Sequence, residues 1–319
     1  MKDILKSLIY SAGHYSSKLI PDKTLRHLLN EILYKPIINK KKLRNNDVPL
    51  FESVLFELRT KCNNDCSFCP ANVHLDKRKD ETMPFETYHK AISELKEMKF
   101  SGRVSFHLNN EPLITPNLFD YVKVAVENLP EVRKFHISTN GLALTKEKSE
   151  KIIASGINWV TINWYDDNLK AALPEKVTDF EAMVNEHNIS NKRKINLEIF
   201  RRKKTQVLLN RAGEAPNKSS SENINLRGFC SYPFTHLCIN PEGNVSICCF
   251  DFYFREITGN VNKNKLFDIW YSDKFSRIRN HLLAGERNML PLCNKCDHCG
   301  VPPGHINTYL KKLMYVLIK

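Results

Sequence analysis

The chain has 319 residues, 42% of them hydrophobic, so it can bury a core for one domain with an appendage or for two domains. Its net charge of +13 comes partly from short basic runs without interleaved aromatic residues, which favours solvated loops or an acidic protein partner over nucleic acid. The ten cysteines occur in clusters that suit metal binding better than a disulfide scaffold, so we expect a reducing compartment.

Residues 1–50 are predicted to form a helical extension ahead of the first strand. Ser, His and Lys interrupt its apolar residues before a signal-peptide core could form, and no run in the chain approaches the length that spans a bilayer. Ile4, Leu5, Leu8 and Ile9 can form one apolar face, which is more typical of packing on a domain than of membrane contact. We therefore expect a cytoplasmic protein without a transmembrane segment.

Strands and helices alternate over residues 51–204, which predicts an α/β domain with a parallel sheet and helical crossovers. Strands are expected at residues 54–58, 104–108, 135–138, 159–164 and 195–200, and helices at 84–98, 118–129, 146–155 and around 180–187. A sixth strand is hard to place. In such sheets the binding groups gather at the carboxyl ends of the strands.

Three cysteines follow the first strand at the spacing C-x3-C-x2-C, namely Cys62, Cys66 and Cys69. Three thiolates without a fourth cysteine nearby would leave one iron of a four-iron cluster open to a small molecule. The alternatives are reduced structural thiols or a zinc site, for which His74 is the nearby candidate for a fourth ligand.

This cysteine motif, with Phe68 before its last cysteine, resembles that of the radical S-adenosylmethionine (SAM) enzymes. The resemblance implies a partial (β/α)6 barrel similar to a TIM barrel, and a [4Fe-4S] cluster bound with SAM. It also implies that one electron cleaves SAM to a 5′-deoxyadenosyl radical, which abstracts hydrogen from an unactivated carbon. The electron donor would be a protein such as flavodoxin or ferredoxin.

The same resemblance implies SAM contacts at strand ends and at Phe68. The turn at residues 109–112 is similar to the family's Gly-Gly-Glu-Pro turn, so Glu111 would hold the SAM amino group, with Asn replacing both glycines. Ser138 and Asn140 end the third strand beside the expected ribose, and Arg201 ends the fifth, where a cation could pair with the SAM carboxylate. A solvated carboxylate, an ordinary turn and a surface arginine are the respective alternatives.

Residues 205–226 are polar and rich in Ser, Asn, Gly and Pro, so we predict a linker or long loop. A β-hairpin is expected at residues 237–249 and helices at 264–271 and 275–284. Residues 303–319 are predicted to be a C-terminal tail.

A second set of cysteines surrounds these elements, with the pattern C-x12-G-x4-C and then C-x2-C. The pattern resembles the SPASM and shorter twitch subdomains, and implies one such subdomain at residues 227–302 with a second, auxiliary [4Fe-4S] cluster. Its ligands would be Cys230, Cys248, Cys293 and Cys296. A full SPASM domain with two auxiliary clusters would need a cysteine where residue 302 is proline, so Cys238, Cys249 and Cys299 would be spares, although Cys299 could replace a neighbouring ligand. A structural zinc site is the alternative.

Taken together, these features predict a radical SAM oxidoreductase that acts on a C–H bond of a small polar, sugar- or cyclitol-like substrate by dehydrogenation or epimerisation. The auxiliary cluster would relay the electron. The alternatives are a peptide maturase with Trp164 and Tyr165 in a wider cleft, or a non-enzymatic metal-binding or RNA-binding protein. No general acid or base can be identified from the sequence.

Overall fold

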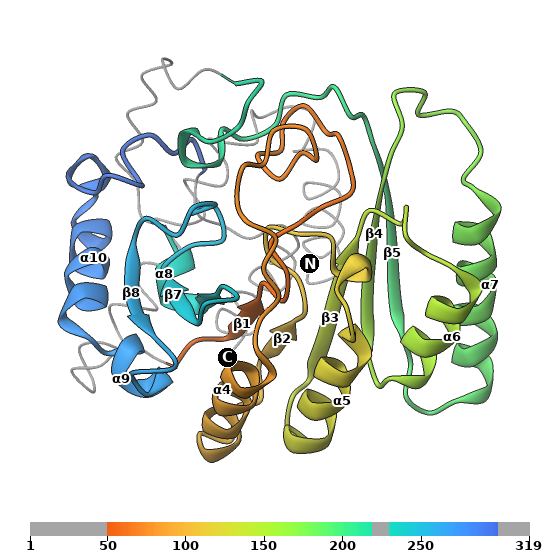
Figure 1. Ribbon diagram of the computed structural model, residues 1–319, viewed down its shortest axis with the longest axis horizontal. Coiled ribbons are helices and arrows are strands. Elements are labelled where there is room, and N and C mark those ends of the chain that lie inside the picture. Colours follow the sequence, from red (N-terminus) through yellow and green to blue (C-terminus); the bar gives the residue numbers. More distant parts are fainter. Residues whose placement is uncertain (1–49, 219–229, 299–319) are drawn as a thin grey trace, which may run out of the picture.

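The computed structural model describes residues 50–218 and 230–298 (Figure 1). Apart from residue 50, the predicted N-terminal extension lies outside these ranges. Residues 219–226 of the predicted loop, Cys299 and the predicted C-terminal tail lie outside them as well.

One sheet of eight strands runs through the described part of the chain, in the order β5-β4-β3-β2-β1-β6-β7-β8 (Figure 1). Its parallel strands are β1 (Ser53–Phe56), β2 (Arg103–Ser105), β3 (Lys134–Thr139), β4 (Trp159–Tyr165), β5 (Asn196–Arg202) and β6 (His236–Ile239). The predicted α/β class with a parallel sheet is confirmed. The sixth parallel strand, which is hard to place from the sequence, is β6, the first strand of the predicted hairpin.

Four helices lie along one face of the parallel strands (Figure 1). They are α4 (Phe85–Glu97), α5 (Leu118–Asn128), α6 (Lys146–Ala154) and α7 (Glu175–Ser190). Helix α6 begins after Thr145, whose hydroxyl accepts a hydrogen bond from the Lys148 backbone N–H at 3.3 Å. Helix α7 is longer than the predicted helix. The prediction is too short because only Val177, Phe180 and Val184 are buried along α7, so most of its length shows no apolar pattern.

The two faces of the parallel strands differ in polarity, because successive side chains of a strand point to opposite sides. One face contributes apolar side chains to the core, namely Val54, Phe56, Val104, Phe106, Phe135, Ile137, Val160 and Ile162. The alternate positions carry Arg103, Ser105, His136, Ser138, Thr161, Asn163 and Glu198. Polar groups therefore line the side of the sheet opposite the helices, up to the carboxyl ends of the strands.

The C-terminal part of the chain continues the same sheet. β7 (Asn244–Ser246) pairs antiparallel with β6 and with β8 (Ile257–Asn260), and Gly243 at φ 82° makes the turn of the predicted hairpin. Because β6 also pairs with β1, the hairpin is not a separate sheet beside the barrel. Short helix α8 (Tyr232–Thr235) precedes β6, and helices α9 (Leu266–Trp270) and α10 (Asp273–Ala284) follow β8.

The described part of the predicted linker, residues 205–218, is a loop held against the rest of the molecule. The Asn210 backbone N–H donates to Asp297 Oδ1 at 2.8 Å, and Asn217 Nδ2 donates to Ser67 Oγ at 3.0 Å. Ser67 lies in the first cysteine motif and Asp297 follows the last predicted ligand. The loop therefore joins the two cysteine regions, which its polar composition alone could not indicate.

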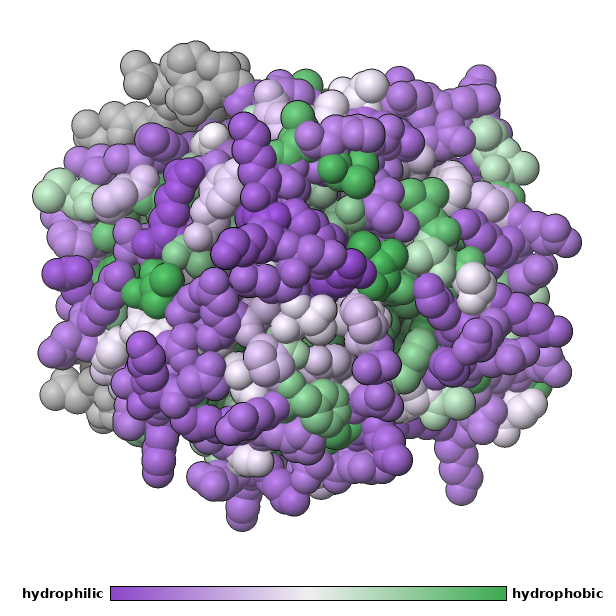
Figure 2. All heavy atoms as spheres, viewed as in Figure 1, coloured by the Kyte–Doolittle hydropathy of each residue, from purple (hydrophilic) through white to green (hydrophobic). Residues whose placement is uncertain are grey.

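The face of the molecule in Figure 2 is mostly hydrophilic, and its hydrophobic atoms lie in small, separate areas. Of the helices in the described ranges, none combines the length and the apolar character needed to cross a bilayer.

Candidate active site

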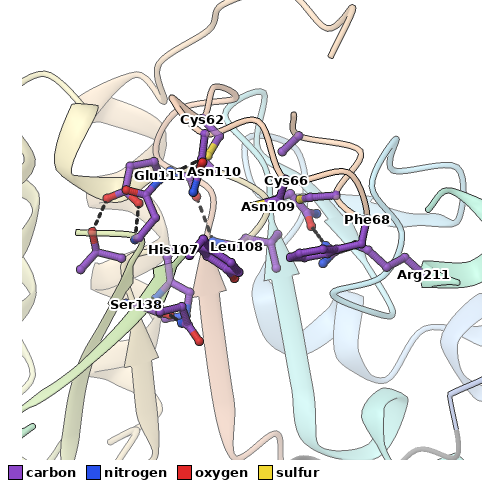
Figure 3. A pocket seen from close by; sticks show the side chains of 17 residues that line it. Cys62, Cys66, Phe68, His107, Leu108, Asn109, Asn110, Glu111, Ser138 and Arg211 are labelled. Atoms are coloured by element: carbon purple, nitrogen blue, oxygen red, sulfur yellow. Dashed lines mark hydrogen bonds between the residues drawn. The ribbon is translucent and has the colours of Figure 1, made fainter. Parts of the chain in front are cut away.

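A cavity of about 230 Å³ lies at the carboxyl ends of β2, β3 and β4 and beneath the loop that follows β1 (Figure 3). All but one of the residues predicted for the first cluster and for SAM line it. These are Cys62, Cys66, Phe68, Cys69, Glu111, Ser138 and Asn140. The structure therefore brings together residues from three different strand ends, at the edge where parallel sheets bind ligands.

Backbone contacts hold the cysteine loop in place. The Cys69 backbone N–H donates to the Cys66 carbonyl at 3.2 Å, and the Asn72 side-chain Nδ2 donates to the same carbonyl at 3.1 Å. The Phe68 ring is buried, and its centroid lies 5.7 Å from that of the Tyr165 ring at the end of β4. The three thiols therefore lie in one ordered loop on the cavity wall.

The protonation chemistry of the first two cysteines suits a cationic group. Burial raises the pKa of both Cys62 and Cys66 to about 12, so each stays a neutral thiol near pH 7 unless a positive centre stabilises its thiolate. Iron supplies such a charge, and the Asn140 amide donates to Cys62 Sγ at 3.7 Å. The donor set of three thiols fits an iron–sulfur cluster with one open iron.

Glu111 is 2% exposed, and its carboxylate links the ends of β2 and β3. One oxygen accepts from the Leu113 N–H at 3.0 Å and from the Thr139 hydroxyl at 2.6 Å, while the other accepts from the Asn140 N–H at 2.7 Å. Burial raises the pKa of Glu111, and these three donors oppose that rise. The carboxylate is thus held in a fixed orientation in the cavity wall.

The two asparagines before Glu111 do not need the positive φ that glycine would allow, since neither is among the described non-glycine residues with positive φ. The Asn110 side chain instead accepts from the Leu108 N–H at 3.0 Å. Asn109 Oδ1 accepts from Arg211 Nη2 at 2.6 Å. Both asparagine side chains thus accept hydrogen bonds through Oδ1 within the turn and from the loop after β5.

Arg201 is not in the cavity. Its side chain is exposed, and Nη1 donates to the backbone carbonyls of Leu169 and Ala171, so the placement does not fit the predicted pairing with a SAM carboxylate. The arginine that does line the cavity is Arg211, from the loop after β5, on the side opposite Glu111 (Figure 3). Its Nε is buried and has no partner among the described residues. Sequence reasoning missed it because no motif marks the loop.

Polar side chains at the strand ends complete the cavity wall. His107 Nδ1 accepts from the Ser138 N–H at 3.0 Å, and burial lowers the pKa of His107 to about 3, so its imidazole is neutral with the proton on Nε2. Asn163 Nδ2 donates to Ser138 Oγ at 3.1 Å. The only sequence signal for His107 and Asn163 was their position near the carboxyl ends of predicted strands.

A second cavity lies between α8, β7 and the last described residues. All four predicted auxiliary ligands line it, namely Cys230, Cys248, Cys293 and Cys296. Backbone N–H groups of Phe250 and His298 donate to Cys248 Sγ at 3.3 Å and to Cys296 Sγ at 3.4 Å. Burial raises the pKa of Cys296 to about 11 and that of Cys293 further, so here too thiolates would need a metal.

Within residues 50–218 and 230–298, no three His, Cys, Asp or Glu side chains converge as ligands of a single metal ion. A four-iron cluster does not require such convergence, because each cysteine binds a different iron and the thiols need only surround a common space. Of the cysteines predicted not to be ligands, Cys238 is buried in a small apolar cluster with Leu55 and Phe254. Cys249 is partly buried and packs against this cluster. Neither lines the second cavity.

Comparison with known families gives two matches. The profile of the radical SAM superfamily matches residues 57–203, and that of the SPASM iron–sulfur cluster-binding domain matches residues 230–299. The two regions contain the first cysteine triad and the second cysteine set, respectively.

Known proteins resemble the chain over most of its length. An S-adenosyl-L-methionine-dependent 2-deoxy-scyllo-inosamine dehydrogenase from Niallia circulans is 29% identical over 252 residues, which are 79% of this chain and 95% of that protein. The crystal structure of BtrN in complex with AdoMet and 2-DOIA has a TM-score of 0.65 and 27% identity, and covers 79% of this chain and 95% of BtrN. An open form of BtrN, at 24% identity and a TM-score of 0.57, covers 78% of this chain and 94% of its own and shows the same fold.

Proposed function

The chain belongs to the radical SAM superfamily and carries a SPASM domain, and from this premise we propose that it dehydrogenates a small cyclitol- or sugar-like alcohol. The observation that carries the proposal is the pairing of two cysteine-lined cavities through the loop at residues 205–218. The similarity to a cyclitol dehydrogenase over 79% of the chain supports the substrate class. We retain the predicted domains, residues 51–204 and 227–302, as part of the proposal.

In the first cavity, Cys62, Cys66 and Cys69 would hold the [4Fe-4S] cluster to which SAM binds. When bound, the cluster and SAM supply a 5′-deoxyadenosyl radical that abstracts hydrogen from carbon. Glu111 would accept a hydrogen bond from the SAM amino group, since one of its oxygens accepts only the Asn140 N–H among the described residues. The side chains of Phe68, Ser138 and Asn140 would contact the rest of SAM.

Oxidation of an alcohol removes one hydrogen atom from carbon, one proton from oxygen and one electron. The hydrogen atom would pass to the 5′-deoxyadenosyl radical, the electron to the auxiliary cluster held by the four cysteines, and the proton to solvent. Arg211 would orient the substrate oxygen, because its buried Nε can donate one more hydrogen bond. It also extends toward the second cavity, where its guanidinium lies 5.6 Å from the Phe250 ring centroid.

We assign the reduction of the first cluster to an acidic donor such as flavodoxin or ferredoxin. The exposed side chains of Arg201, near the end of β5, and of Lys203, just after it, lie at the same edge of the sheet as the first cavity, which supports this choice. The peptide-maturase alternative needs Trp164 and Tyr165 in an open cleft. In the structure, Tyr165 packs on Phe68, and Trp164 is partly buried and packs against the core, so these contacts do not favour that alternative.

The test is transfer of deuterium from substrate to cofactor. With 2-deoxy-scyllo-inosamine deuterated at its ring carbons, we expect deuterium in 5′-deoxyadenosine and one ketone formed per SAM consumed, measured by mass spectrometry. A panel of deuterated cyclitols and amino sugars tests the substrate class. If the enzyme cleaves SAM but no member of the panel transfers deuterium, the proposed substrate class is wrong.

Glu111→Gln tests the proposed contact to SAM. We expect SAM to bind about tenfold more weakly or worse, because a hydrogen bond to a charged group contributes about 1.5–3 kcal/mol and about 1.4 kcal/mol is tenfold in affinity. Binding is measured by calorimetry on the reconstituted protein. Asp120→Asn, at an exposed position on α5, is the matched control and should bind SAM normally. Lower thermal stability with unchanged SAM affinity would limit Glu111 to a structural role.

A further inference from the structure

We infer that Arg287 makes the auxiliary cluster easier to reduce, by placing a buried positive charge against its four cysteine ligands. The inference rests on the proposed assignment of Cys230, Cys248, Cys293 and Cys296 as those ligands.

Arg287 begins the short helix η4 (Arg287–Met289), between α10 and the last cysteines. Its side chain is 3% exposed and lines the same cavity as the four cysteines. Nε is buried without a hydrogen-bond partner, and no carboxylate among the described residues pairs with the guanidinium. An arginine is always charged, and burying its charge without a partner is costly. An anion in the cavity would therefore stabilise the buried guanidinium of Arg287.

The four cysteines are the groups that can supply this anion. As thiolates around a cluster they would give the site a net negative charge that increases by one unit when the cluster takes up an electron. A fixed positive charge nearby stabilises the reduced form more than the oxidised form, and hence raises the reduction potential. In their thiolate form, all four cysteines would raise the pKa of Arg287 against the opposing effect of burial.

Other groups around the cavity do not replace this charge. Among the described residues that line it, Arg287 alone has a permanently positive side chain. The nearby Asp297 carboxylate already accepts from the Asn210 N–H and pairs with Lys218. The backbone N–H groups of Phe250 and His298, which donate to Cys248 Sγ and Cys296 Sγ, add partial positive charges to that of Arg287. In the proposed reaction, a cluster that is more easily reduced would accept the substrate electron more readily.

The experiment measures the midpoint potential of the auxiliary cluster in the full-length protein with both clusters reconstituted. A mediated dithionite titration is followed by electron paramagnetic resonance, and the auxiliary signal is recognised because added SAM does not change it. The variants are Arg287→Met, which removes the charge, and Arg287→Lys, which keeps it. Lys295→Met removes an exposed positive charge between two ligand cysteines and is the matched control.

For Arg287→Met we expect the equilibrium constant for reduction to fall at least tenfold, which for a one-electron couple is a potential about 59 mV more negative. Arg287→Lys and Lys295→Met should stay within about threefold of the wild type, the latter because solvent screens an exposed charge. A wild-type potential in Arg287→Met with the iron content unchanged would overturn the inference.

Cluster assembly provides a second readout. If Arg287→Met loses the auxiliary iron while Arg287→Lys keeps it, the positive charge is required and the inference stands. Loss in both variants would instead assign Arg287 a role in packing and overturn the inference. Failure of the ligand assignment is recognised separately, because the wild-type iron content would then persist after Cys293 and Cys296 are replaced.

Discussion

Replacing Cys66 by alanine is expected to lower formation of 5′-deoxyadenosine by more than about 100-fold in dithionite-reduced protein, since mutation of a residue that only supports a metal ligand already costs about 10–100-fold. Cys66 is buried on the wall of the first cavity, which the other two cysteines of its loop also line. Two remaining thiols cannot hold a site-differentiated four-iron cluster. The measurement is the rate of 5′-deoxyadenosine release under anaerobic conditions, together with the iron content.

Cys238→Ala is the matched control for this variant. Cys238 is also buried, but it lies in the apolar cluster with Leu55 and Phe254 and lines neither cavity. It should retain the wild-type rate and iron content. If Cys66→Ala releases 5′-deoxyadenosine as fast as the wild type, the first cavity is not the site of radical formation.

The double variant Cys293→Ala, Cys296→Ala is expected to abolish ketone formation while leaving SAM cleavage without product within a few-fold of the wild type. Both residues line the second cavity and neither lines the first. Iron should fall from about eight to about four atoms per chain, as expected for the loss of one of two four-iron clusters. Product is measured by mass spectrometry and iron by a colorimetric assay.

Metal binding couples to folding, so circular dichroism of the double variant must accompany these assays. Cys238→Ala, at a predicted spare that lines neither cavity, should keep both the iron and the product. Ketone formation at the normal rate in a folded double variant would show that the reaction does not need the auxiliary cluster. Retention of all the iron would show that other residues bind it.

The shared placement of the first three candidate cysteine ligands could be predicted because their pattern is local. Cys62, Cys66 and Cys69 lie within one loop, so their spacing alone brings them to the same cavity wall. The helices and strands followed from apolar periods of 3.6 and 2, except where α7 buries few residues. The auxiliary set needed the family pattern, since Cys230 and Cys296 meet only after the intervening elements have folded.

The arginines could not be predicted in this way. Arg201 and Arg202 end the same strand, but adjacent residues point to opposite faces, so a shift of one residue decides which of them faces the site. Arg202 Nε reaches Asn163 in the cavity wall at 2.8 Å, whereas Arg201 turns to an exposed loop. Arg211 and Arg287 come from segments without any motif.

The sequence by itself determined the type of chemistry, because thiol spacing and the strand–helix alternation are properties of short segments. Only the tertiary structure decided which side chains surround that chemistry. β6 pairs with β1 and joins the C-terminal region to the barrel sheet, and the loop at residues 205–218 binds both cysteine regions. These long-range pairings set the positions of Arg211 and Arg287 beside the two cavities, and no local pattern encodes them.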